Sequence, residues 1–218
     1  IYTARVTVEE TDNWAGWSED YTFEVKRASL TITADDKTVV YGESDIEYSF
    51  TEAGLKNDDK FEDLLSAAGV SVKYGGAGGQ GEDGYVPGNE RGAVGEYVID
   101  ISESFAADAL ANYTVEFYPG TLEVTARPVT IGIVYQRTTY GDVLDPLTWN
   151  VLDREYKVFE GDAEEDIFTL DFENGEKPVN VGKYNIVGTV NEAGLGKNYS
   201  VTFVGQNAYG GNDYELSK

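Results

Sequence analysis

The 218-residue chain contains no histidine, no cysteine and no methionine. Without imidazole or thiol groups it has no histidine general base, no thiolate nucleophile and no zinc site built from nitrogen or sulfur ligands. Disulfides are excluded as well, so cysteine usage does not identify the redox compartment. Most hydrolase triads and all thiol enzymes are therefore ruled out, and carboxylates remain as the acid–base groups.

Basic residues are also scarce, since 16 Lys and Arg stand against 40 Asp and Glu, a formal net charge of −24. Such a charge disfavours nucleic acid and anionic membrane surfaces as partners, and it favours a soluble monomer. No apolar run approaches the length of a membrane span. The chain starts at Ile1 in mid-pattern, without a signal peptide, so we expect any targeting or anchoring segment to lie outside it.

Apolar and polar residues alternate through most of the chain, for example in residues 30–33 and 113–117, which is typical of half-buried antiparallel strands. Two stretches have helical spacing instead. Residues 57–69 form one, and residues 162–170, where Asp162 and Glu165 stand at capping-box spacing, form the other. We therefore expect a mainly β (α+β) fold of small antiparallel domains, each with one short helix, in a β-grasp-like arrangement. An immunoglobulin-like β-sandwich is the alternative.

The sequence repeats itself with an offset of 99 residues in its early blocks and of 87 and 86 residues in its later ones. We expect a first segment (residues 28–126) and a second segment (residues 127–218), preceded by the C-terminal strands of an earlier copy (residues 1–27). The residues that recur form a structural repeat signature: Tyr41, Gly42, Tyr97, Asn112 and Tyr113 in the first segment, and Tyr140, Gly141, Tyr184, Asn198 and Tyr199 in the second.

The junction between the segments, residues 122–131, has no Gly or Ser spacer and contains Pro128, which predicts stiff end-to-end packing. Each Tyr-Gly pair is followed by an acidic residue, which indicates a tight turn whose Tyr ring packs on the rim of the core. Ligand contact by Tyr41 or Tyr140 is the alternative interpretation.

Two other features suggest a binding surface. Residues 74–95 hold nine glycines and predict a long loop. Trp14 and Trp17 flank the tip of a predicted hairpin, where they either contact a missing partner domain or form a patch for carbohydrate or protein.

Clustered carboxylates at residues 35–36, 58–59 and 164–166 are the remaining candidates for chemistry. A glycosidase needs two carboxylates across a cleft, but solvated helix starts explain these residues better, so we expect no catalysis. We also expect no cofactor. The alternative is a calcium ion held by Asp58, Asp59, Glu62 and Asp63, although no EF-hand loop is present.

The order of the blocks Leu-Thr-Ile-Thr, Val-Tyr-Gly-Glu, Gly-Leu-Lys-Asn-Asp, Gly-Glu-Tyr-Val-Ile and Asn-Tyr-Thr-Val-Glu-Phe in the first segment resembles the MBG domain (YGX type). The second segment keeps the Tyr-Gly-Asp, Gly-Lys-Tyr and Asn-Tyr-Ser blocks, whereas residues 159–162 are a loose echo of the Asn-Asp block. The resemblance implies a tandem, mucin-binding-like module of a bacterial adhesin. It also implies an extracellular location, with attachment to the cell wall or envelope through parts outside this chain.

From these observations we expect a non-enzymatic role as a stiff stalk or spacer, which contributes to adhesion to host glycans or extracellular proteins and contacts adjacent repeats of the same chain. A second hypothesis is an adhesive receptor that uses the Gly-rich loop or the Trp hairpin. A third is an accessory domain of a large secreted carbohydrate-active enzyme.

Overall fold

The structure is a computed structural model that describes residues 1–43, 46–64, 71–74, 93–101, 105, 108–205 and 213–217. The chain divides into two compact units. Unit 1 contains Ile1–Asp35, Tyr48–Ser71 and Ile99–Gly120, and unit 2 contains Asp36–Glu47, Val72–Val98 and Thr121–Lys218. The predicted glycine-rich loop falls almost wholly outside the described residues.

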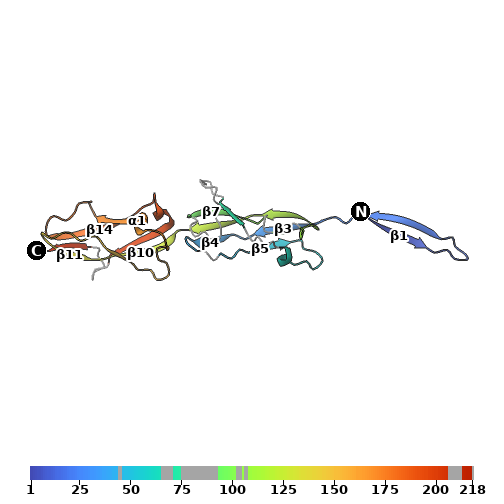
Figure 1. The fold of residues 1–218 in the computed structure, drawn as a ribbon, viewed down its shortest axis with the longest axis horizontal. Helices are drawn as coiled ribbons and strands as arrows, with labels where there is room; N and C mark the ends of the chain where they lie inside the picture. Colours follow the sequence, from blue (N-terminus) through green and yellow to red (C-terminus); the bar gives the residue numbers. More distant parts are fainter. Residues whose placement is uncertain are drawn as a thin grey trace. The chain divides into compact units, whose positions relative to one another are not determined.

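Strands dominate the described chain, and the predicted mainly β fold is confirmed (Figure 1). Up to residue 126 the strands are β1 (Tyr2–Val8), β2 (Trp17–Phe23), β3 (Ala28–Ala34), β4 (Lys37–Val40), β5 (Phe50–Ala53), β6 (Ser71–Tyr74), β7 (Gly95–Asp100), β8 (Tyr113–Tyr118) and β9 (Gly120–Thr125). From residue 127 they are β10 (Arg127–Ile133), β11 (Gln136–Thr139), β12 (Trp149–Val151), β13 (Phe168–Phe172), β14 (Gly182–Val190), β15 (Tyr199–Gly205) and β16 (Asp213–Ser217).

The same sheet order occurs in both segments. A three-stranded sheet, β5-β3-β8, corresponds to β12-β10-β15, and a four-stranded sheet, β4-β9-β7-β6, corresponds to β11-β16-β14-β13. The strands β1 and β2 form a separate two-stranded sheet. The sheets are mixed rather than purely antiparallel, because β3 pairs in parallel with β8, β4 with β9, β10 with β15 and β11 with β16.

Alternation places one face of each central strand in a core. Leu30, Ile32 and Ala34 of β3 are buried, as are Val129, Ile131 and Ile133 of β10. In unit 2, Ile133 packs with Phe172, Ile186 and Tyr214. Burial of these aliphatic and aromatic side chains is the main favourable contribution to folding.

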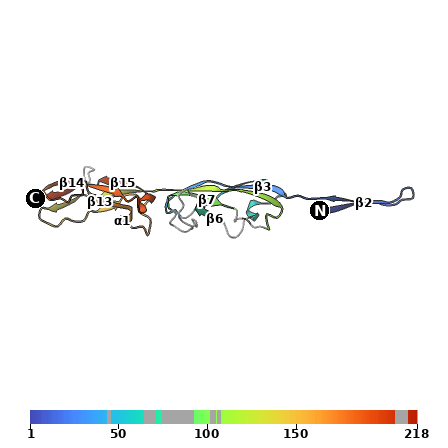
Figure 2. The same cartoon turned by 90° about the horizontal axis from the view of Figure 1, so that it is seen from above.

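Both predicted helical stretches contain a short helical element. The described part of the first is one 3-10 turn, η1 (Phe61–Leu64), and residues 65–70 lie outside the described residues. The second, α1 (Glu164–Ile167), is one turn that leads into β13 beside β14 (Figure 2). Its N-cap is Ala163 without a side-chain bond, so the predicted cap by Asp162 is wrong, because that carboxylate accepts hydrogen bonds from two tyrosines instead.

A third short helix, η2 (Leu195–Asn198), was not predicted. Among the described residues, no helix is long and apolar enough to cross a membrane.

The two glycines of β14 give a matched test of core packing. A Cβ at Gly188 would lie 2.3 Å from the Phe203 ring, whereas a Cβ at Gly182 would meet its nearest neighbour at 3.7 Å. We expect Gly188→Ala to lower the free energy of unfolding by about 1–3 kcal/mol through overpacking, and Gly182→Ala to change it by less than about 1 kcal/mol. Urea unfolding of both variants measures the difference, and equal effects would contradict the packing described here.

Candidate functional site

Each Tyr-Gly pair forms the predicted tight turn at the end of a strand. In the Tyr41 turn (Val40–Glu43), the Glu43 N–H donates to the Val40 carbonyl at 3.0 Å, and Gly42 has φ +87°. A positive φ at the third position is the geometry of a type II turn, for which glycine is preferred. The Tyr41 N–H donates to the Thr125 carbonyl at 2.9 Å, so β9 positions the turn.

The Tyr140 turn (Thr139–Asp142) has the same geometry. The Asp142 N–H donates to the Thr139 carbonyl at 3.0 Å, and Gly141 has φ +96°. The Tyr140 N–H donates to the Ser217 carbonyl at 2.8 Å, which is the counterpart of the bond to Thr125. The two turns are therefore equivalent in backbone and in placement.

Their side chains have different surroundings. Tyr41 is 1% exposed and Tyr140 is 62% exposed. Tyr41 lies in a pocket of the second segment, within unit 2, where its ring contacts Phe159 and Tyr199. A Cβ at Gly42 would lie 2.5 Å from the Phe159 ring, whereas nothing lies within 4 Å of one at Gly141.

The pocket that holds Tyr41, here called the Tyr199 pocket, is built around one carboxylate oxygen. Asp162 Oδ2 accepts the Tyr41 hydroxyl at 3.0 Å and the Tyr199 hydroxyl at 2.5 Å. The Phe159 N–H donates to the Tyr199 hydroxyl at 3.1 Å. Hydrogen bonds to a charged acceptor are stronger than those between neutral groups, so this carboxylate binds the two phenols together.

Ring and guanidinium contacts complete the Tyr199 pocket. The Tyr41 ring lies edge-on to Tyr199 and Phe159, with centroids 5.5 and 6.0 Å away. Arg127, the first residue of β10, donates from Nη1 to the Tyr41 carbonyl at 3.0 Å and from Nε to the Lys157 carbonyl at 2.6 Å. Edge-to-face aromatic pairs add stabilisation beyond the area they bury.

The Tyr199 hydroxyl is held in its protonated form. Burial first, and then its hydrogen bond to Asp162, raises the pKa of Tyr199 above the ordinary tyrosine value. A phenolate at this position would face the Asp162 carboxylate, and like charges at that distance repel.

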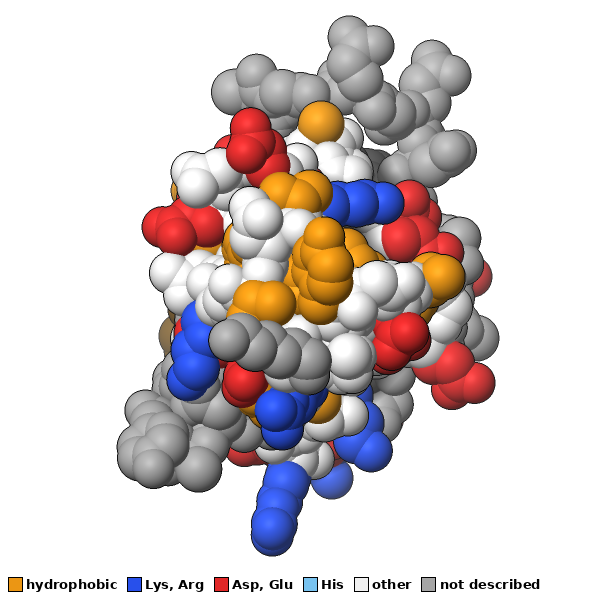
Figure 3. Space-filling view, turned by 90° about the vertical axis from the view of Figure 1, so that its left-hand side faces the viewer, with side chains coloured by type: hydrophobic (Ala, Val, Ile, Leu, Met, Phe, Trp, Pro, Cys, Tyr) orange, Lys and Arg blue, Asp and Glu red, His pale blue; other side chains and the backbone are white. Residues whose placement is uncertain are grey.

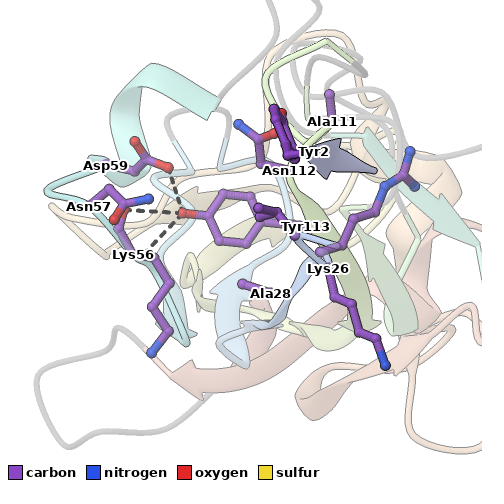
Figure 4. Close-up of a pocket in the computed structure, with 11 residues that line it drawn as sticks. Tyr2, Lys26, Ala28, Lys56, Asn57, Asp59, Ala111, Asn112 and Tyr113 are labelled. Atoms are coloured by element: carbon purple, nitrogen blue, oxygen red, sulfur yellow. Dashed lines mark hydrogen bonds between the residues drawn. The ribbon is translucent and has the colours of Figure 1, made fainter. Parts of the chain in front are cut away.

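The first segment contains an equivalent pocket within unit 1, here called the Tyr113 pocket (Figure 4). The Tyr113 hydroxyl donates to Asp59 Oδ2 at 2.5 Å and accepts from the Lys56 N–H at 3.0 Å. Asp59 follows Lys56 by three residues, as Asp162 follows Phe159. The hydrogen bond to Asp59 raises the pKa of Tyr113. The cavity has a volume of about 640 Å³, and Tyr2, Lys26 and Asn112 also line it.

The other residues of the predicted signature lie outside the two turns and hydroxyl pairs described above, and each makes a hydrogen bond elsewhere. The Tyr97 hydroxyl donates to the Ala93 carbonyl at 2.5 Å, and the Tyr184 hydroxyl donates to the Asn180 carbonyl at 2.7 Å. In both cases the acceptor lies four residues earlier in the chain. Asn198 is buried and its Oδ1 accepts from the Val94 N–H at 3.1 Å, while the carbonyl of exposed Asn112 accepts from the Ala28 N–H at 3.0 Å.

The acidic clusters do not assemble into a site among the described residues. Asp36 accepts from the Thr121 N–H, Glu164 accepts from the Trp149 indole, and Asp59 accepts from Tyr113. In the described part of the chain no three acidic side chains lie close enough to hold a metal, including those predicted for calcium.

Trp14 and Trp17 are exposed on the β1–β2 hairpin.

Sequence reasoning missed Arg127, Phe159 and the role of Asp162. The signal that identifies Phe159 and Asp162 is their spacing, which equals that of Lys56 and Asp59; each pair precedes an Asn-Tyr block. The residue with positive φ before the carboxylate differs between the two segments: it is Gly161 (φ +99°) in the second and Asp58 (φ +63°) in the first. The two sequences therefore do not look alike at this shared turn.

The two turns give a matched test of docking. Both Gly42→Ala and Gly141→Ala force a side chain into the left-handed region, at a cost of about 1–3 kcal/mol. Only Gly42→Ala also meets the Phe159 ring, and we expect it to lower the free energy of unfolding by about a further 1–3 kcal/mol. Thermal or urea unfolding measures both, and equal losses would contradict docking of the Tyr41 turn.

A pH titration tests the protonated Tyr199. Because its folded pKa lies above its unfolded value near 10, its contribution is complete below about pH 10 and is lost as the pH rises further. We expect Tyr199→Phe to cost about 1 kcal/mol at pH 8, and we expect this difference from the parent chain to shrink between pH 10 and 11. Urea unfolding of both proteins between pH 8 and pH 11 measures this difference in the free energy of unfolding. A difference that stays constant over that range would contradict the prediction.

Comparison with known proteins bears on the first segment. No curated protein matches the chain, and no solved structure does either. Residues 30–123, which contain the Tyr41 turn and Tyr113, match the family model described as MBG domain (YGX type), the family that the sequence resembles.

Proposed function

We propose that this chain is a non-catalytic stalk segment of a bacterial cell-surface adhesin, in which MBG-type modules dock in series. The family match supports a surface-associated repeat or binding module. The observation that carries the proposal is Tyr41, whose ring, hydroxyl and carbonyl are all bound by the second segment. A tether between independent modules needs none of these contacts.

The connection itself supports stiffness. β9 ends at Thr125 and β10 begins at Arg127, which leaves a single residue between the strands. Arg127 uses its guanidinium to hold the carbonyl of Tyr41, so the connecting backbone and the docked turn are bound to each other. Short connections with such contacts restrict reorientation of the modules they join.

For such a surface protein we propose host glycans or extracellular proteins as partners. The exposed Trp14 and Trp17 offer aromatic surface for stacking on sugars. The net charge of −24 keeps such a stalk soluble and discourages lateral association.

Pulsed electron–electron spectroscopy across the junction tests the proposal. The chain has no cysteine, so Glu96→Cys and Thr202→Cys allow two spin labels to be attached on exposed strand positions on either side of the junction. We expect a narrow distance distribution in the parent chain and a distribution about twice as broad with Tyr41→Ala, because removal of the phenol frees the junction.

Tyr140→Ala is the matched control, since it removes the same residue from the exposed turn and is expected to leave the distribution narrow. A broad distribution in the parent chain would mean that the junction is flexible. An unchanged distribution with Tyr41→Ala would mean that the docked turn does not cause stiffness. Either result overturns the proposal.

A further inference from the structure

We propose that the Tyr113 pocket binds the Tyr-Gly turn of another MBG-type module, carried on a strand that pairs in parallel with the edge of β2 opposite β1. This inference rests on the proposed stalk function and names the partner of the pocket in the first segment. The argument uses the residues that line the pocket, the hairpin beside it and the occupied pocket of the second segment.

The polar groups that hold a tyrosine in one pocket recur in the other. Asp162 and the Phe159 N–H bind Tyr199 at 2.5 and 3.1 Å, and Asp59 and the Lys56 N–H bind Tyr113 at 2.5 and 3.0 Å. In the Tyr199 pocket the same carboxylate oxygen also accepts the incoming Tyr41 hydroxyl. Asp59 Oδ2 is the corresponding acceptor, and Figure 4 shows it facing the Tyr113 hydroxyl at the pocket wall.

The hairpin beside the pocket has the pairing of a module that lacks a strand. Tyr2 pairs with Phe23 across β1 and β2, as Tyr184 pairs with Tyr214 across β14 and β16. The strand β16 pairs with β11 on its other edge, whereas in the described part of the chain the sheet of β1 and β2 has two strands. An edge of this kind is a template for a further strand.

The register of that further strand brings its turn to the pocket. Phe23 precedes Ala28 by five residues, as Leu122 precedes Arg127, the counterpart of Ala28. In the first segment β4 pairs with β9 from Leu122 to Thr125, which delivers the Tyr41 N–H to the Thr125 carbonyl. The counterpart of Thr125 is Lys26, which lines the Tyr113 pocket.

Apolar side chains of the hairpin are exposed, whereas the equivalent side chains of the first segment are covered. Phe23 is 52% exposed and Val25 is 69% exposed, whereas their counterparts Leu122 and Val124 are buried beneath the rest of their module. Exposed apolar side chains gathered in this way mark surfaces that bind another protein segment.

Charge also favours the proposed occupant. In a chain of net charge −24, the pocket gathers Lys26, Arg27 and Lys56. The two Tyr-Gly turns of this chain are followed by Glu43 and Asp142, so an incoming turn of this type presents a carboxylate to three cations.

The second segment shows what such a turn looks like before docking. Tyr140 is exposed next to the Ser217 end of β16, and the neighbouring Val143 and Val181 are exposed as well. Figure 3 views the chain from the side of the C-terminus and shows hydrophobic side chains gathered in the middle of that face, with acidic and basic side chains around them.

A chimera tests the inference on the whole chain. A copy of residues 28–95 placed before Ile1 completes the module to which β1 and β2 belong, and it supplies a copied Tyr41 turn. We expect amide hydrogen exchange at Arg27 and Asn112 to slow at least about tenfold relative to the parent chain, because the docked turn covers the pocket. The same chimera with Tyr→Ala in the copied turn is the control, and it is expected to exchange as the parent does.

Two results would overturn the inference: a folded chimera in which Arg27 and Asn112 exchange at the parent rate, or equal protection in the chimera and its control. If the added copy does not fold, a peptide of residues 36–44 titrated into the parent chain decides. Shifts of the Arg27 and Asn112 amide signals that disappear with the Tyr41→Ala peptide support the inference, and no shift up to about 5 mM peptide overturns it.

These outcomes are separable from those of the stalk proposal. The spin-label experiment measures the junction at Tyr41, whereas the chimera measures the Tyr113 pocket. A narrow distribution of spin-label distances would support the stalk function. If amide exchange at Arg27 were also the same in the chimera and the parent chain, only the inference about the Tyr113 pocket would be overturned.

Discussion

One oxygen of Asp162 holds the junction of the two segments together, because it accepts a hydrogen bond from a tyrosine of each. Tyr199 belongs to the second segment and orients the carboxylate, with the Phe159 N–H fixing the phenol in turn. Tyr41 arrives from the first segment on a turn that β9 positions through Thr125. The buried rings of Tyr41 and Tyr199 pack edge-on to each other beside this half-buried carboxylate.

The composition of the chain explains why the junction takes this form. With no cysteine or histidine, neither a disulfide nor a nitrogen- or sulfur-ligated metal can join the modules. The 40 acidic residues supply carboxylate acceptors, and neutral phenols can donate hydrogen bonds to them without adding charge. Sixteen tyrosines supply those donors, together with the ring surface that packs around them.

Much of the fold follows from the sequence, and the site follows only in part. Alternation identified β3 and β8 because the inward residues of both strands are apolar, and the Tyr-Gly-acidic blocks identified both turns. The pocket escaped prediction because its acceptor, Asp162, has the spacing of a helix cap, and because the turn that places it is built from different residues in the two segments. The destination of the Tyr41 ring depends on contacts between segments, which local patterns do not encode.

The equivalence of the two turns has a consequence for how a protein of this kind changes in length. Each segment carries one Tyr-Gly turn and one phenol–carboxylate pocket, so a single module contains both parts of the docking contact that we propose. Duplication or loss of a whole module inside the gene therefore regenerates a matched joint at every step. No compensating substitution is needed, and the reach of the assembly evolves in units of about a hundred residues.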